Sequence, residues 1–291
     1  MMALALIIFG IIVLTYIGLK KNYNMYKLFT RVSVLVTFGS LVLIVAYILL
    51  RGIPHLKLSM FSLNYTSENV SMLPSIITTL IVVVLGIAIA TPIGISTAIY
   101  LVEYADSKSK MVEIIRLAAE TLQGIPSIVY GLFGMLFFVL RLGLKYSILS
   151  GVFTISIMIL PLIIRSTEEA LKSVPDSIRH ASFALGAGKL RTIGKIVIPA
   201  AMPGIISGIV LATGRIVGET ACLIYTLGTA TALPTSLFSS SRTLALHMYM
   251  LSSEGLHVGE AYATGTVLLV FVLIINYISN RLASKYMEVK S

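Results

Sequence analysis

Two ionisable residues, Arg215 and Glu219, lie within a long apolar stretch of the chain. An ionisable side chain at the depth of a lipid bilayer costs about 2.5–3.5 kcal/mol on insertion scales, and residues of this kind are typical of substrate or ion pathways. The two positions are four apart, which on an α-helix places them on one face and within reach of each other. We therefore expect a polar pathway here, with an ion pair that only holds helices together as the alternative.

The elements that position this pair are predicted to be membrane-spanning helices. The chain is 57% hydrophobic and 12% charged, with a mean hydropathy of +0.97, which lies outside the range of soluble globular domains. A helical span needs about 20 predominantly apolar residues. The stretches that meet or approach this length are residues 3–19, 28–50, 73–101, 117–140, 147–164, 200–226 and 261–280. The fold class predicted is an all-α polytopic membrane protein.

The basic residues predict which ends of these spans face the cytoplasm. Most of the 22 Lys and Arg residues follow the first, third, fifth and seventh stretches, and few follow the others. Cytoplasmic loops are enriched in Lys and Arg. We therefore expect a multi-pass protein of the plasma (inner) membrane, with the 165–199 loop and the C-terminus in the cytoplasm. This arrangement explains the net charge of +10 without nucleic acid as a partner.

The N-terminal segment is predicted to be separate from the rest of the domain. A signal peptide carries its positive charge before the apolar run, whereas here Lys20 and Lys21 follow it. We expect residues 1–24 to form an extra hydrophobic helix with its N-terminus outside, preceding a membrane domain of residues 25–291. A segment lying on the lipid surface, or a true start at Met25, is the open alternative.

The loop at 165–199 has a pattern of helix stops and starts. Pro175 ends the preceding helix, Asp176 or the next residue is a suitable N-cap, and Gly186 stops the short helix between them. A second, amphipathic piece follows and ends at Pro199, where the next span begins. This pattern predicts a rigid lever rather than a tether, and an ordinary basic interfacial loop is the alternative.

The same loop resembles a signature of binding-protein-dependent ABC importers. Each membrane subunit of that family carries Glu-Ala-Ala, three residues, Gly, nine residues, Ile, one residue and Leu-Pro. The matching residues here are His180, Ala181, Ser182, Phe183, Ala184, Leu185, Gly186, Ile196, Ile198 and Pro199. His180 stands in place of the Glu, Ser182 in place of the second Ala and Ile198 in place of the Leu. The resemblance implies that residues 178–187 are a coupling helix that docks into a cleft of an ATPase subunit.

Further motifs resemble those of phosphate importer permeases. They are Gly124-Ile-Pro-Ser-Ile-Val-Tyr-Gly-Leu-Phe-Gly134, Arg165-Ser-Thr-Glu-Glu169 followed by Val174-Pro175, Gly214-Arg-Ile-Val-Gly-Glu-Thr-Ala221 and Leu244-Ala-Leu-His-Met-Tyr249. The last motif points to the PstA-type subunit over its PstC-type partner. The resemblance covers roughly residues 28–285 and implies a six-helix core of the type I importer permeases, with residues 1–24 as one helix outside it.

By this resemblance the chain is expected to be the permease subunit of an ATP-driven phosphate importer. Its expected partners are a homologous PstC-type permease, a dimer of ATP-binding subunits, an extracytoplasmic phosphate-binding protein, phosphate and membrane lipid. The chain is not expected to be an enzyme or to hold a cofactor or metal. Gly188-Lys189 lacks the Ser or Thr that a phosphate-binding loop needs, because Leu190 follows. ATP is therefore expected to bind to a partner subunit.

The chemistry of the buried pair agrees with an oxyanion substrate. Arg presents a planar fork of donors that matches phosphate oxygens and stays charged at any relevant pH. Glu219 is expected to neutralise Arg215 in the empty state and to accept a hydrogen bond from protonated phosphate, which sulfate does not offer at neutral pH. By resemblance an arginine at the position of Arg165 acts in transport, with a membrane-boundary anchor as the alternative. The candidate pathway residues are Arg215, Glu219, Thr220, Arg165, Glu168 and Glu169.

Small residues accompany the charges on the same predicted helix. At about 100° per residue, Gly204, Gly208, Arg215 and Glu219 fall within an arc of about 60°. Small residues four apart permit close approach of helices in lipid. We expect two subunits to meet along this stripe, around the pathway, and packing within one chain is the alternative.

Three other functions remain open at the level of sequence. One is a permease for another oxyanion. A secondary anion transporter would use Arg215 and Glu219 in proton coupling, but such folds commonly contain internal repeats and none is visible. A membrane-embedded enzyme would need several carboxylates or histidines deep in its spans, where Glu219 stands alone.

Overall fold

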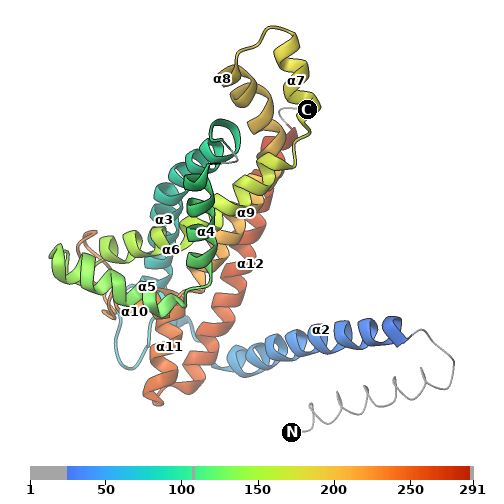
Figure 1. The fold of residues 1–291 in the computed structure, drawn as a ribbon. Helices are drawn as coiled ribbons and strands as arrows, with labels where there is room; N and C mark the ends of the chain where they lie inside the picture. The colour runs from blue at the N-terminus through green and yellow to red at the C-terminus, as the bar shows by residue number, and fades with distance from the viewer. Residues whose placement is uncertain (1–24, 107–108, 289–291) are drawn as a thin grey trace.

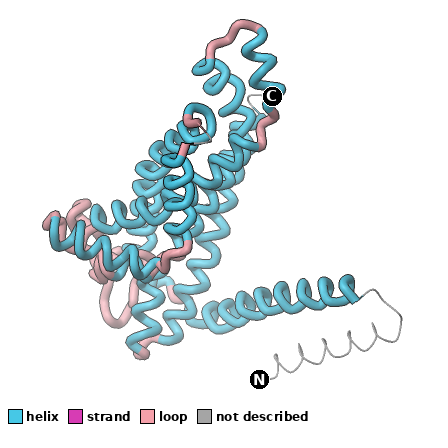
Figure 2. Tube along the Cα trace, in the orientation of Figure 1, coloured by secondary structure: helices cyan, strands magenta, loops and turns pink. Residues whose placement is uncertain are grey.

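The computed structural model describes residues 25–106 and 109–288, and within these ranges the chain forms helices and loops with no strand. Figures 1 and 2 show a bundle of long helices from which one helix departs. The helices long and apolar enough to cross a membrane belong to α2 (Met25–Gly52), α3 (Leu73–Ile99), α6 (Ile148–Lys172), α9 (Ile198–Val217) and α12 (Val258–Glu288). The predicted all-α polytopic membrane architecture is confirmed. The helix predicted in residues 1–24 lies outside the described residues.

Helix α6 is the central element of the bundle, and α3 and α9 pack against it. Its first turn is capped by Ser147, whose Oγ accepts the backbone N–H of Ser150 at 3.2 Å. Side chains are buried along most of its length. Gly94 of α3 lets the two backbones approach, because a Cβ there would lie 2.7 Å from Cγ2 of Ile163.

The stretch predicted as a span at 117–140 is not one continuous helix, because the chain bends there by 102°. The segment comprises α4 (Lys110–Gln123), α5 (Ser127–Gly134) and a π-helix, η4 (Met135–Arg141). Gly124 is a weak helix former, and Pro126 has no N–H and disfavours a helical conformation at the residue before it. Taken together, the bent pair supplies a sixth candidate span in the described residues.

The span predicted at 200–226 is also interrupted. Helix α9 ends at Val217 with Gly218 as its C-cap, and α10 (Ala221–Ile224) is a separate short helix. Glycine at a helix end costs little because it lacks a Cβ, and helices commonly end at this residue type. Glu219 therefore lies outside α9, between two helices.

At its other end α9 continues beyond the predicted boundary. Helix α8 (Lys189–Thr192) runs into α9 through a π-helix, η5 (Ile193–Val197), and together they form one apolar helix. The prediction that the amphipathic piece stops at Pro199 is wrong. Pro199 is tolerated because it stands in the first turn of α9. Proline has no backbone N–H to donate. The π-helix η5, directly before Pro199, changes the hydrogen-bond register at this point of the chain.

The predicted span at 147–164 is short of the observed helix. Because α6 continues to Lys172, the residues from Arg165 to Glu169 lie on its last turns and not in a loop. Helix α7 (Asp176–Ala184) follows Pro175, and Gly186 ends the segment with a φ of +82°. The short helix and its glycine stop are therefore confirmed.

The opposite end of the bundle from α7 and α8 carries shorter elements. They are η1 (Ile53–His55), η2 (Leu58–Phe61) and α11 (Leu244–Glu254). Figure 1 places α11 at this end, and the C-terminal part of α12 runs toward the end that carries α7. Helix α2 packs against α12 and otherwise leaves the bundle at a steep angle.

Candidate functional site

Arg215 lies on the last turn of α9, two residues before the helix ends. Its side chain is half-buried, and it forms no ion pair or hydrogen bond with the other described residues. Tyr130 of α5 lies within electrostatic range. The structure therefore holds a permanent cation near the end of an apolar helix, without an ion-pair partner in the described part of the chain.

Glu219 is buried and contacts the start of the next helix, α10. Its Oε1 accepts the backbone N–H of Cys222 at 3.0 Å, so the carboxylate caps α10. The predicted pairing of Arg215 and Glu219 on one helix face is wrong, because Gly218 ends the helix between them. The prediction that Glu219 neutralises Arg215 is wrong as well, because the two side chains form no ion pair in the described residues.

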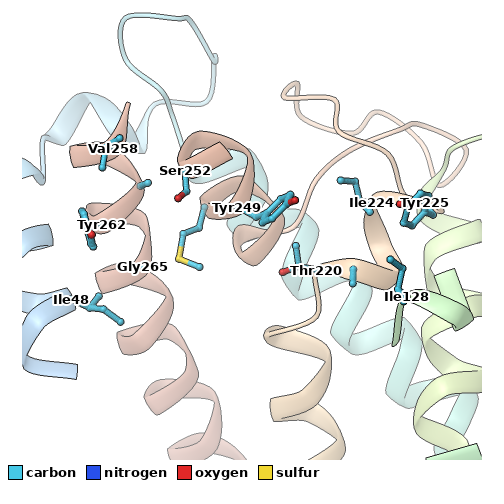
Figure 3. Close-up of a pocket in the computed structure, with 13 residues that line it drawn as sticks. Ile48, Ile128, Thr220, Ile224, Tyr225, Tyr249, Ser252, Val258, Tyr262 and Gly265 are labelled. Carbon is cyan, nitrogen blue, oxygen red and sulfur yellow. The ribbon is translucent and has the colours of Figure 1, made fainter. Parts of the chain in front are cut away.

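Thr220 lines a cavity of about 550 Å³. In Figure 3 its side chain lies between Tyr249 of α11 and Ile224 of α10, and Tyr225 follows directly after α10. Residues of α2, α5 and α12 complete the wall. Arg215 and Glu219, with which the sequence grouped Thr220, do not line this cavity. The polar residues of the lining are Thr220, Tyr225, Tyr249, Ser252 and Tyr262.

A second polar group surrounds Glu168 on the last turns of α6. The Glu168 carboxylate is buried, and its Oε1 lies 2.7 Å from both Nε of Arg116 and Nζ of Lys172. Arg116 belongs to α4, so this ion pair joins two helices. The two cations offset the loss of hydration that burial imposes on this carboxylate. The sequence prediction included Glu168 but missed both of its partners.

Arg165 and Glu169 lie beside this group on the more exposed side. Nε of Arg165 is 3.2 Å from Oε1 of Glu169, and Nη1 is 3.5 Å from Oε2 of Glu120. Both groups line a cavity of about 230 Å³ between α4 and α6. The cavity contains as many carboxylates as cations, so its charges balance. The residues of the charged lining are Arg116, Glu120, Arg165, Glu168, Glu169 and Lys172.

The glycines of α9 show how the two polar groups are placed. A Cβ on Gly204 would lie 2.6 Å from Cβ of Ala170, and one on Gly208 would lie 2.5 Å from Cβ of Ser166. Both glycines therefore pack against α6 of the same chain, and the prediction that they meet another subunit is wrong. Arg215 is seven residues beyond Gly208, which is about 10 Å along the helix axis from the level of Ser166.

The predicted coupling segment is largely exposed. Among its predicted residues Ser182 turns inward, and its Oγ is 2.8 Å from Oγ1 of Thr192. The others lie on the surface: His180, Ala181, Phe183, Ala184, Leu185 and Gly186. Exposed apolar side chains here include Phe183 at 43% and Leu185 at 89%. Apolar residues gathered outside the bundle on a short helix are typical of a protein interaction site.

Some of these contacts were readable from sequence spacing and others were not. Arg165–Glu169 and Glu168–Lys172 are four residues apart on a helix, a spacing that brings side chains together. The contact of Arg116 with Glu168 joins separate helices and has no local signal. Among the described residues, no group of three His, Cys, Asp or Glu side chains is placed to hold a metal ion.

Comparison with known sequences gives a consistent set of relatives. The family model described as "Binding-protein-dependent transport system inner membrane component" matches residues 90–287. The probable ABC transporter permease protein YqgI of Bacillus subtilis is 36% identical over 204 residues, which cover 65% of this chain and 69% of the relative. The phosphate transport system permease protein PstA 1 of Mycobacterium tuberculosis is 36% identical over 187 residues, covering 64% and 61%.

A PstA homolog of Mycoplasma pneumoniae is 30% identical over 293 residues, which cover 94% of this chain and 44% of the relative. The match thus spans less than two-thirds of the length of either PstA relative. Solved structures share the fold. The bacterial alginate ABC transporter in complex with its pentasaccharide-bound periplasmic protein gives a TM-score of 0.65 at 14% identity, covering 90% of this chain and 94% of the other. The MetNI methionine transporter gives 0.57 at 17%, covering 83% and 97%.

Proposed function

This chain belongs to the family of binding-protein-dependent transport system inner membrane components, and we propose that it is the permease subunit of an ATP-driven importer of inorganic phosphate. The relatives named phosphate transport system permease PstA support phosphate as the substrate. In this proposal the chain forms the translocation pathway together with a homologous PstC-type subunit. A dimer of separate ATP-binding subunits supplies the energy.

The observation that carries the proposal is the state of Arg215. It is half-buried near the end of an apolar helix and has no ion-pair partner among the described residues. A cation in such a place is costly unless an anion neutralises it. A travelling oxyanion supplies that charge, and the guanidinium fork matches two of its oxygens.

Glu219 is proposed to select for a protonated anion. Its Oε1 is held by the backbone of α10, and within the described residues Oε2 carries no hydrogen bond. A carboxylate oxygen accepts a hydrogen bond from the hydroxyl of protonated phosphate but repels an oxyanion that has no proton. Thr220 adds a hydroxyl group at the adjoining cavity.

The second polar group is proposed to lie farther along the same path. Because α6 and α9 pack side by side, Arg165 and Arg215 lie at different depths on one helix pair. Arg165 is exposed and shared between Glu120 and Glu169. We expect it to exchange these carboxylates for phosphate as the anion leaves toward the cytoplasm.

The exposed α7 segment is proposed to receive the force of ATP hydrolysis. In the orientation that the Lys and Arg residues predict, α7, α8 and the C-terminus face the cytoplasm, and the end of the bundle that carries α11 faces outward. The apolar side chains of Phe183 and Leu185 suit a cleft on an ATP-binding subunit. The outer end would receive phosphate from an extracytoplasmic phosphate-binding protein.

Phosphate uptake by the reconstituted complex tests the proposed pathway. Replacing Arg215 with Gln removes the charge, and we expect uptake to fall at least tenfold, equivalent to about 1.4 kcal/mol. Glu219→Gln keeps an oxygen that accepts from Cys222 but places N–H groups at the other position. We expect it to lower uptake to a similar extent without loss of folded complex.

The matched control is Arg141→Gln, which removes the same charge from an exposed position on η4. Uptake at the wild-type rate in both the Arg215 and Glu219 variants would contradict the proposal. Competition by unlabelled sulfate in the wild-type complex distinguishes the alternative, an importer of another oxyanion.

A further inference from the structure

Arg179 lies in the first turn of α7, and several hydrogen bonds hold its side chain in place. Its side chain is only 13% exposed, although most residues of α7 lie on the surface. Every nitrogen of its guanidinium donates a hydrogen bond. A side chain buried in this way at the edge of an exposed segment links that segment to what lies beneath it.

One of these links reaches the end of α3. Glu103 lies in the π-helix η3 (Tyr100–Tyr104) that continues α3, and its side chain is 8% exposed. Arg179 donates to Oε1 of Glu103 from Nη2 at 2.9 Å and from Nε at 3.2 Å. The two residues are 76 positions apart in the chain, so this ion pair is a tertiary contact between two elements.

A second link reaches the end of α6. Nη2 of Arg179 donates to the carbonyl of Leu171 at 2.9 Å, and Nη1 donates to that of Val174 at 2.6 Å. The last carbonyls of a helix have no partner within the helix, so a guanidinium satisfies them. Nη1 also lies 3.1 Å from Oδ1 of Asp176, which fixes Arg179 against the start of its own helix.

Two weaker contacts surround this arrangement. Ser182 is joined to Thr192 of α8 by a buried hydroxyl pair at 2.8 Å. Nζ of Lys189 lies 5.0 Å from the ring centroid of Tyr104, next to Glu103 in η3. The coupling segment is thus fastened to α8 and, through Arg179, to the ends of α3 and α6.

We propose that Arg179 is a positioning residue that joins the α7 segment to the ends of α3 and α6, so that a displacement of α7 moves both helices with it. Breaking a buried pair strands the remaining charge, which strongly favours keeping the pair intact during motion. Helix α6 carries Arg165 and packs on α9, which carries Arg215. These contacts of Arg179 with α3 and α6, called the joint below, connect the surface proposed to bind the ATPase with the proposed pathway. This proposal rests on the proposed function.

The first test measures the joint without reference to transport. Spin labels are placed at Ser177 of α7 and at Tyr100 of η3, both exposed, in a background with the buried Cys222 replaced by Ala. In the full complex we expect Arg179→Gln and Glu103→Gln each to broaden the distance distribution at least twofold. Arg191→Gln removes an equal charge from an exposed site on α8 and is expected to leave the distribution unchanged. An unchanged distribution in Arg179→Gln overturns the proposal.

The second test measures the ratio of phosphate imported to ATP hydrolysed. We expect the Arg179 and Glu103 variants to lower this ratio at least fivefold. A merely structural role would lower uptake and hydrolysis together in proportion to folded complex, and an unchanged ratio would overturn the joint. Arg179→Lys, which keeps the charge but not the fork, provides a reading if Arg179→Gln does not fold, with an intermediate ratio expected.

The two proposals fail in different ways. A wild-type complex that imports no phosphate overturns the proposed function, and the spin-label distances then decide the joint alone. Normal phosphate import with an unaltered distance distribution in the Arg179 variants overturns the joint and leaves the proposed function standing.

Discussion

At the scale of single residues, burial leads the charged side chains of this chain to different arrangements. Glu103 and Glu168 are each 8% exposed, and each lies beside an arginine. Such pairing offsets the loss of hydration that burial imposes on a charge. Arg215 is half-buried and has no such partner in the described residues. This difference supports the proposal that Arg215 is available to a substrate.

Burial also changes the protonation of His247. It is fully buried in α11, beside Arg242 and the ring of Tyr65. Burial, followed by the positive charge of Arg242, lowers the pKa of His247 from its usual 6.5 to about 3. Between these two pH values the unfolded chain binds a proton that the folded chain does not. The contribution of neutral His247 to the free energy of unfolding is therefore fully present above pH 6.5, and it is lost as the pH falls toward 3.

We expect His247→Gln to reduce this acid sensitivity. The slope of unfolding free energy against pH should fall by up to about 1.4 kcal/mol per pH unit over this window. The measurement is denaturation of the detergent-solubilised protein between pH 7 and pH 4. His180→Gln, at an exposed position on α7, is the control and should leave the slope unaltered. A slope that His247→Gln does not change would show that His247 is already protonated in the folded state.

At the scale of elements, close packing of α9 on α6 sets the depth of both polar groups. Gly208 has its nearest neighbours in Ser166, whereas Gly214 on the same helix has nothing within 4 Å of the position a Cβ would take. The two glycines share a helix and a residue type but differ in surroundings. They therefore separate the effect of packing from that of helix propensity.

Gly208→Ala is expected to destabilise the protein by about 1–3 kcal/mol, because the added methyl group overlaps Ser166. Gly214→Ala is expected to be neutral or to stabilise by up to about 1 kcal/mol, since alanine favours helix. Thermal unfolding in detergent measures both. Adding Ser166→Gly should restore part of the loss in the Gly208 variant, and equal effects of the two alanines would refute the close contact.

At the scale of the whole molecule, the exposed apolar residues mark where other molecules are needed. Helix α2 leaves the bundle with its apolar window unburied. Leu185 beside α7 and Leu256 beside α11 are 89% and 82% exposed at opposite ends of the bundle. Since both leucines contribute little to the core, replacing either one tests binding rather than folding.

Leu185→Asp is expected to reduce co-purification of the ATP-binding subunit at least tenfold, because a carboxylate enters an apolar interface. Leu256→Asp is the matched control and should leave co-purification unchanged. The measurement is the ratio of the two subunits after affinity purification from membranes. Equal retention of the ATP-binding subunit in both variants would place its binding surface elsewhere.

Much of the architecture follows from local properties of the sequence. Hydropathy locates the spans, and Pro175 with Gly186 delimits the short helix α7. Glycine and proline also mark the break at Gly124 and Pro126, but the apolar residues on both sides led to the prediction of one continuous span. The break at Gly218 was hidden in the same way, so the partnership expected for Arg215 and Glu219 does not form.

What the sequence by itself determined is the membrane class, the approximate helices and the segment likened to a coupling helix, since each depends on neighbouring residues. Only the tertiary structure decided that Glu219 caps α10, that Arg116 binds Glu168 and that Arg179 binds Glu103. Contacts between helices depend on the rotation and axial shift of each helix against the next. Packing of the whole bundle sets both quantities, and a pattern along one helix does not specify them.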